Sequence, residues 1–243
     1  VPYGTVSIDG AKLALESELP GWDFEAVQTA AANAWESELA RIKVEIKDPE
    51  QKKIFYTAMY HAMIAPMLFS DVNGDYRGAD DKVYNSDKPR YTCFSLWDTY
   101  RAKQPLMTII HPEKAGDFVA TMVDICDKQG DLPVWHLWGN ETDCMVGDPG
   151  IPVVADAIVK GIEGFDREAA FEAIKKTARG IESVAPLMSS SRQVMYGNQN
   201  WSTTVYGITA PYLYVKNYEM DLGRPINIDD DNNGDTWNSW FRR

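Results

Sequence analysis

Residues 112–130, PEKAGDFVATMVDICDKQG, carry helix signals at both ends and along one face. The stretch opens with a proline, which the first turn of a helix tolerates, and it closes with Gly130, a residue that commonly terminates a helix. Phe118, Met122 and Ile125 recur at helical spacing and therefore fall on one face. The stretch predicts a long helix that packs this apolar face into a core.

Helical signals continue on both sides of this stretch. Asp23 and Asp166 each precede an apolar-periodic segment and are typical N-cap residues, and Asp48-Pro49 is a cap followed by a first-turn proline. Including the first stretch, we expect helices over residues 23–39, 48–66, 96–110, 112–130, 152–162 and 166–180.

The other segments lack helical periodicity. Residues 1–9 alternate weakly, which favours a short N-terminal strand, and residues 10–20 indicate a connection. Residues 70–94 and 131–151 are polar and rich in Gly and acidic side chains, so we expect long loops, and residues 186–243 indicate turns and short pieces. The predicted fold is mainly α, with long loops at one end of a helical bundle or an α/α toroid.

The amino-acid composition excludes some classes of function and favours others. The 243 residues include 24 Lys and Arg and 36 Asp and Glu, for a net charge of −12, and such a surface repels nucleic acid. The apolar run Met63–Phe69 is too short to span a bilayer, so membrane insertion is not expected. The 8 Trp and 12 Tyr offer flat faces that suit sugar rings, whereas the 3 Cys fit neither a disulfide framework nor a zinc pattern.

The first cluster of chemistry-bearing residues is LWDTYR, residues 96–101. Asp98 offers a carboxylate that can accept hydrogen bonds from two adjacent sugar hydroxyls, and Trp97 offers a face for a sugar ring. The structural alternative is that Asp98 caps its helix and pairs with Arg101.

The second cluster is WHLWGNET, residues 135–142. Trp135 and Trp138 flank a histidine, and Glu141 follows a glycine turn. A Glu held among aromatic rings loses water, which favours the protonated form that a general acid needs. The alternative is a surface Glu on a turn.

The third cluster is the acidic string over residues 229–235, DDDNNGD. It begins like an EF-hand loop, but the twelfth position is Trp240 rather than Glu, and no flanking helices are evident. A loose calcium loop or a solvated acidic turn fits the pattern better.

Several strings together resemble one family, the calcium-dependent exo-acting α-mannosidases of glycoside hydrolase family 92. Order and spacing fit this family from about residue 1 to residue 180. The strings are residues 18–35, which begin ELPGWDF, then QKKIFYTAMY (51–60), LFSDVNGDYRG (68–78), FSLWDTYR (94–101), LPVWHLWGNETDCMV (132–146) and PVVADAIVKGIEGF (152–165).

The family consists of an N-terminal β-sandwich and a C-terminal (α/α)6 barrel, so the resemblance implies an incomplete helical toroid. Residues 1–20 would be the last strand of the sandwich and a linker, residues 21–185 part of the barrel, and residues 186–243 its divergent, compressed tail. Family members are usually exported, which implies a periplasmic or extracellular location, although Val1-Pro2-Tyr3-Gly4 has no signal-peptide character.

The resemblance also implies an inverting hydrolysis of terminal α-linked mannose in a glycan substrate. Glu141 matches the general acid, and Asp229 and Asp231 resemble the aspartates that activate water. The positions matched to substrate binding are Trp97, Asp98, Arg101, Trp138 and Asn140. Calcium is the implied cofactor, and none of its ligands is mapped onto this sequence.

Two other functions remain open from the sequence. The chain could be an inactive remnant or a carbohydrate-binding module that binds mannosides through Trp97 and Asp98 without turnover. It could also be a calcium-binding interaction protein, a hypothesis that depends only on residues 229–235.

Overall fold

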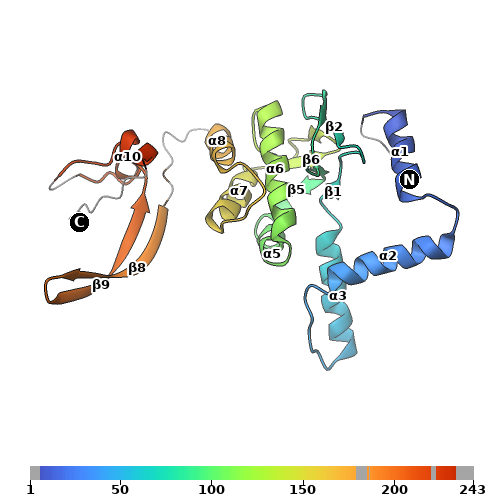
Figure 1. Ribbon diagram of the computed structural model, residues 1–243, viewed down its shortest axis with the longest axis horizontal. Helices are drawn as coiled ribbons and strands as arrows, with labels where there is room; N and C mark the ends of the chain where they lie inside the picture. The colour runs from blue at the N-terminus through green and yellow to red at the C-terminus, as the bar shows by residue number, and fades with distance from the viewer. Residues whose placement is uncertain (1–5, 179–184, 186, 220–222, 234–243) are drawn as a thin grey trace. The chain divides into compact units, whose positions relative to one another are not determined.

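The computed structural model describes residues 6–178, 185, 187–219 and 223–233 (Figure 1). The chain divides into two compact units, Val1–Arg179 and Gly180–Arg243. The assignment of residues 1–20 to a sandwich strand and linker, of 21–185 to a barrel and of 186–243 to its divergent tail stays a prediction. Among the described residues, no helix is both long enough and apolar enough to cross a membrane.

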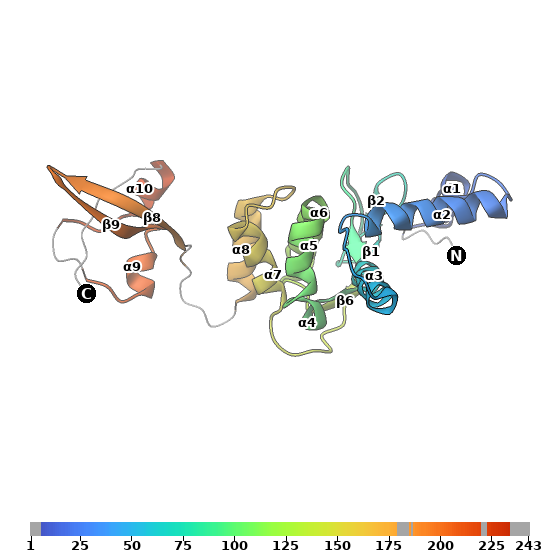
Figure 2. The ribbon, with the colours of Figure 1, turned by 90° about the horizontal axis from the view of Figure 1, so that it is seen from below.

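The centre of the first unit is helix α6, Pro112–Gln129, which confirms the helix predicted from residues 112–130. It ends at Gly130, whose φ of 110° is in the region that glycine adopts without strain. Figures 1 and 2 both show α6 between the α7–α8 pair and the small sheets. The helices that pack against α6 are α5 (Lys103–Ile110), α7 (Gly150–Val159) and α8 (Arg167–Thr177).

The packing around α6 is close enough to require glycine at one position. A Cβ atom added to Gly116 would lie 2.0 Å from the carbonyl oxygen of Glu163, in the loop that leads to α8. Phe118 and Met122 are buried on the same helix, and Val154 and Ala170 complete the core from α7 and α8. The apolar face predicted for α6 is therefore the centre of the hydrophobic core.

The chain begins with helix where a strand was expected. Helix α1 spans Ile8–Glu18, so the predictions of a strand over residues 1–9 and a connection over 10–20 are wrong for the described residues. Ser7 caps this helix by accepting a hydrogen bond from the Gly10 N–H at 3.0 Å. The cap and the Ala- and Leu-rich segment that follows it outweigh a weak alternation of only a few residues.

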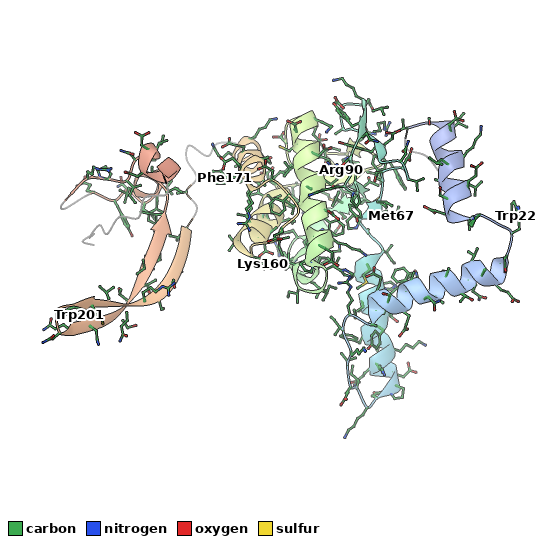
Figure 3. All side chains as sticks on the ribbon, in the orientation of Figure 1. Trp22, Met67, Arg90, Lys160, Phe171 and Trp201 are labelled. Atoms are coloured by element: carbon green, nitrogen blue, oxygen red, sulfur yellow. The ribbon has the colours of Figure 1, made fainter. Side chains whose placement is uncertain are left out.

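Two further helices follow, α2 (Phe24–Leu39) and α3 (Pro49–Met63), and both predicted caps are confirmed. Asp23 accepts a hydrogen bond from the Ala26 N–H, and Asp48 accepts one from the Glu50 N–H. Trp22 is fully exposed and projects from the turn between α1 and α2 (Figure 3).

Helix α2 buries none of its residues, and charged groups attach its C-terminal end to the core. Glu38 lies 2.6 Å from Nε2 of the fully buried His111 and 2.7 Å from Nζ of Lys114. Arg41 donates a hydrogen bond to the carbonyl of Ile110 at 3.0 Å and pairs with Glu113 at 2.9 Å. The end of α2 is thereby fixed at the junction of α5 and α6.

Short antiparallel strands occupy parts of the two predicted loops, so those predictions are wrong in these parts. Polar loop composition hides the strands because each pairs over only two or three residues. The pairs are β1 (Met67–Leu68) with β4 (Tyr91–Thr92), β2 (Asp75–Arg77) with β3 (Val83–Asn85), and β6 (Trp135–Leu137) with both β5 (Phe94–Ser95) and β7 (Asn140–Glu141).

Several predicted helix boundaries also change. The helix expected over residues 48–66 ends at Met63, and the helix expected over residues 152–162 is α7, which spans Gly150–Val159. The helix expected over residues 96–110 is divided into α4 (Leu96–Thr99) and α5, because residues 100–102 form a turn. Helix α8 has its predicted cap, Asp166, and ends at Thr177 rather than at residue 180.

In the second unit, the prediction of turns and short pieces is wrong for residues 187–208 and is confirmed for the described residues after them. Strands β8 (Leu187–Tyr196) and β9 (Gln199–Ile208) form a ten-residue antiparallel ladder around a two-residue Gly197-Asn198 turn. A Gly-Asn pair between β-branched and aromatic residues is a hairpin signal. The prediction of turns rested on the lack of helical periodicity and did not use this signal. Two short helices follow, α9 (Tyr212–Val215) and α10 (Ile228–Asn233).

His136 is a buried polar residue in the small sheet of the first unit. Its side chain is 2% exposed, and Nδ1 lies 3.3 Å from the hydroxyl of Thr92. Burial lowers the pKa of His136 to about 4, although the negative charge of Glu141 acts in the opposite direction. The positive charge of Arg77 lowers the pKa of His136 further. The imidazole is therefore neutral at physiological pH.

We predict that His136 makes the fold sensitive to acid. The unfolded chain binds a proton at this histidine near pH 6.5, whereas the folded chain does so only near pH 4. The contribution of His136 to the free energy of unfolding is therefore fully present above pH 6.5. It decreases by about 3 kcal/mol as the pH falls from 6.5 to 4.

Urea unfolding measured from pH 7.5 to pH 4 tests this expectation. His136→Gln should lose less stability than the parent across this range, whereas His61→Gln, at an exposed histidine on α3, should follow the parent curve. Parallel curves for the parent and His136→Gln would contradict the expectation.

Candidate active site

The candidate site is built on the β6–β7 hairpin. His136 pairs with Glu141 and Leu137 with Asn140, which leaves Trp138 and Gly139 as a two-residue turn. Their φ angles are 50° and 87°, and a type I′ hairpin turn requires positive φ at both positions. Gly139 adopts this conformation without strain, but a tryptophan seldom does, and such outliers concentrate at functional sites.

Four backbone N–H groups hold the carboxylate of Glu141. Val134 donates to Oε2 at 2.8 Å, while Trp135, Thr142 and Asp143 donate to Oε1 at 2.9, 2.9 and 3.0 Å. Two donors come from the start of β6 and two from the segment after β7, so the side chain joins both ends of the hairpin. We call this arrangement the amide clamp.

The amide clamp gives the two carboxylate oxygens different roles. Oε1 accepts three hydrogen bonds and Oε2 accepts one, so Oε2 keeps capacity for a proton or a substrate atom. Backbone donors stabilise negative charge on a carboxylate. Trp135, which the sequence suggested as an aromatic wall, contacts Glu141 through its backbone N–H.

The segment after β7 bends to reach Glu141. Asp143 has a φ of 48°, a left-handed conformation that Asp tolerates better than most residues. The Thr142 hydroxyl donates to the Trp135 carbonyl at 2.8 Å, which fastens this segment to β6. Consecutive amides that point at one anion in this way form an anion-binding concavity.

Glu141 also lines a cavity of about 340 Å³ in the first unit. This volume lies in the range of small-molecule sites, and much of the lining is acidic. The lining residues are Gln129, Asp131, Leu132, Val134, Glu141, Asp143, Met145, Gly147 and Asp148.

Helix α4 brings the first predicted cluster to the same sheet. Ser95 of β5 pairs with Trp135 of β6, and α4 begins at the next residue. Trp97 is 45% exposed, and Asp98 is exposed and accepts a hydrogen bond from the Ser95 hydroxyl. A single strand pairing therefore connects α4 to the hairpin that carries Glu141.

The alternative interpretation of Asp98 does not hold in the described part of the chain. Asp98 and Arg101 form no ion pair there, and Arg101 instead contacts the hydroxyl of Tyr100, with its guanidinium 5.0 Å from the ring centroid. Ser95 occupies the N-cap position of α4 without a side-chain cap hydrogen bond. Asp98 thus keeps an exposed carboxylate.

The remaining predicted residues divide between the units. Asn140 lies on β7 beside Glu141 and is exposed, as is Trp138 at 38%. Asp229 is exposed on α10 of the second unit, so the structure does not bring the predicted carboxylate pair together within one unit. The side chain of Asp231 lies outside the described residues.

The calcium loop expected from the acidic string is not seen in residues 229–233, the part of that string that the structure describes. Within the described part of the chain, no group of three or more His, Cys, Asp or Glu side chains is arranged to hold a metal ion. The acidic string begins a short helix rather than the expected loop, and neighbouring side chains on a helix point in different directions. Both oxygens of Asp230 are bonded to Arg224, at 2.6 and 2.8 Å.

Asp143 and Arg77 both shape the hairpin, and neither is among the site residues predicted from the sequence. The Trp138-Gly139 pair contains a glycine and lies between two short strands, which is a sequence signal for a hairpin turn. Asp143 follows the predicted acid closely but matches no motif. Arg77, whose Nη2 donates to the Trp138 carbonyl, is 61 residues away in sequence, and no local pattern relates the two.

Comparison with known proteins shows the family to which the chain is related. The model of the glycosyl hydrolase family 92 catalytic domain matches residues 10–221. An uncharacterized secreted glycosidase from Arthroderma benhamiae is 31% identical over 170 residues, which are 67% of this chain and 18% of that protein.

Solved structures agree with this match. The family 92 α-mannosidase BT3965 from Bacteroides thetaiotaomicron has a TM-score of 0.70 and 40% identity, over 72% of this chain and 24% of that one. The inverting mannosidase BT2199 from the same organism has a TM-score of 0.66 and 27% identity, over 70% and 23% of the two chains. The chain therefore spans less than a quarter of these relatives, and through this match it belongs to glycosyl hydrolase family 92.

Proposed function

We propose that the chain is part of a glycoside hydrolase that removes terminal α-linked mannose from glycans with inversion at the anomeric carbon. The observation that carries this proposal is the amide clamp on Glu141, beside a cavity, in a chain that belongs to family 92. A carboxyl group in a fixed orientation with one open oxygen is suited to proton transfer.

In the proposed reaction, Glu141 is the general acid and Oε2 carries the proton. With Oε1 as the carbonyl oxygen that accepts three N–H groups, the Oε2 hydroxyl can give its proton to the glycosidic oxygen as that bond breaks. The leaving sugar departs as an alcohol, and Glu141 becomes a carboxylate that the clamp stabilises.

The base in this proposal is Asp229, with Asp231 as its neighbour. It takes a proton from a water molecule that attacks the anomeric carbon from the opposite face. Inversion needs roughly 6.5–9.5 Å between the two carboxyl groups to leave room for this water.

Trp97 and Trp138 are proposed to stack against the terminal mannose, and Asp98 is proposed to accept hydrogen bonds from two of its hydroxyls. Both tryptophans are partly exposed, and the Asp98 carboxylate is exposed on α4. Arg101 and Asn140 complete the proposed contacts. The helices around α6 would form one part of an (α/α)6 toroid, with these residues at its mouth.

Calcium remains part of the proposal because the family resemblance implies it, and no step above passes through the metal. An exported location, in the periplasm or outside the cell, is proposed on the same ground and on the secreted relative from Arthroderma benhamiae. The substrates would be mannose-containing glycans such as N-glycans.

Proton NMR of the purified chain with an α-mannoside tests the reaction. We expect β-mannose to appear before mutarotation, and we expect a chelator to slow its release and added calcium to restore it. Binding heat in calorimetry without any product would instead support the carbohydrate-binding module, and release of α-mannose first would contradict inversion.

Substitution of Glu141 tests the assignment of the acid. Glu141→Gln should lower kcat by about 10²- to 10⁴-fold, because the amide keeps the shape of the side chain but has no proton to transfer. The matched control is Glu16→Gln at an exposed glutamate on α1, which should leave kcat unchanged. Equal rates for Glu141→Gln and the parent would show that Glu141 is not the acid.

A further inference from the structure

The turn of the β6–β7 hairpin is held in a conformation that its sequence does not favour. Trp138 has a φ of 50°, and bulky residues in this region cost conformational free energy. A strained residue persists only where the surrounding structure fixes it. The contacts of the turn should therefore show which group does so.

Arg77 of β2 supplies this contact from 61 residues away. Its Nη2 donates a hydrogen bond to the carbonyl oxygen of Trp138. The guanidinium also lies against Gly139, since a Cβ atom added there would be 3.1 Å from Nη2 and 3.2 Å from Nε. On its other side, Nη1 pairs with Asp81 at 3.4 Å. The planar fork thus contacts both residues of the turn.

The tip and the base of the hairpin are held by different groups. The amide clamp on Glu141 takes its donors from residues 134, 135, 142 and 143, none of which belongs to the turn. Arg77 contacts the turn and its positive charge also acts on His136 of β6, but none of the four hydrogen bonds of the amide clamp involves Arg77. Loss of Arg77 should therefore disturb Trp138 and leave Glu141 in place.

We propose that Arg77 is a positioning residue, which fixes the Trp138 turn so that the indole presents its face to a sugar ring. This inference rests on the proposed function, because Trp138 is a proposed substrate contact there. Arg77 itself touches neither the reacting atoms nor the general acid. Its role is to hold the substrate-binding end of the hairpin while the amide clamp holds the catalytic end.

The kinetic test is a comparison of KM with kcat in the 243-residue chain. Arg77→Lys keeps the positive charge but loses the fork, so KM for an α-mannoside should rise about tenfold while kcat stays within about twofold of the parent. The matched control is Lys82→Ala, which removes an exposed cation from the same β2–β3 turn and should change neither constant. An unchanged KM, or an equal loss in kcat, would overturn the proposal.

Fluorine NMR of 5-fluorotryptophan-labelled chain tests the same point without catalysis. Trp138→Phe identifies the Trp138 resonance, which should shift in Arg77→Lys and stay in place in Lys82→Ala. A Trp138 resonance that does not move in Arg77→Lys would overturn the positioning role. If the parent chain releases no mannose, the proposed function fails while this measurement still decides the role of Arg77.

Discussion

The carboxylate of Glu141 is the point on which the site depends. Its side chain accepts backbone N–H groups from Val134 and Trp135 before the hairpin and from Thr142 and Asp143 after it. These four donors close the hairpin at its base and orient one carboxylate oxygen. Hydrogen bonds to a charged acceptor are stronger than neutral ones, and a buried N–H left without an acceptor is costly. Glu141 is therefore both a structural part of the hairpin and the best candidate for its chemistry.

The core explains why this hairpin has a fixed place. Helix α6 packs α5, α7 and α8 around Phe118 and Met122, and Phe94 of β5 is buried in the same cluster. Because β5 pairs with β6 and leads directly into α4, one edge of the core orients both Trp97-Asp98 and the hairpin. The site residues thus come from segments about 40 residues apart in sequence that one small sheet brings together.

The helices were largely predictable because their signals are local. Asp23, Asp48 and Asp166 each form the predicted N-cap, and Gly130 ends α6. The short strands were not predictable because two- or three-residue pairings carry no periodicity. Ser7 shows the reverse case, in which a single cap outweighed an apparent alternation and began a helix.

The hydrogen bonds of the candidate site could not be predicted from the sequence. The WHLWGNET string directed attention to Glu141 and Trp138, yet the backbone donors and the Arg77 contact depend on pairings that sequence spacing does not reveal. Trp135 was expected to offer its ring to Glu141, and the structure adds a hydrogen bond from its backbone N–H.

In the proposed reaction, Glu141, fixed by the amide clamp, protonates the departing glycosidic oxygen. The most direct measurement is the dependence of hydrolysis by Glu141→Gln on the leaving group of synthetic α-mannosides. A dinitrophenyl group needs little protonation, so the variant should approach the parent within about tenfold, whereas a methyl or sugar leaving group should show a loss of about 10³-fold or more. A loss of equal size for all leaving groups would contradict the account.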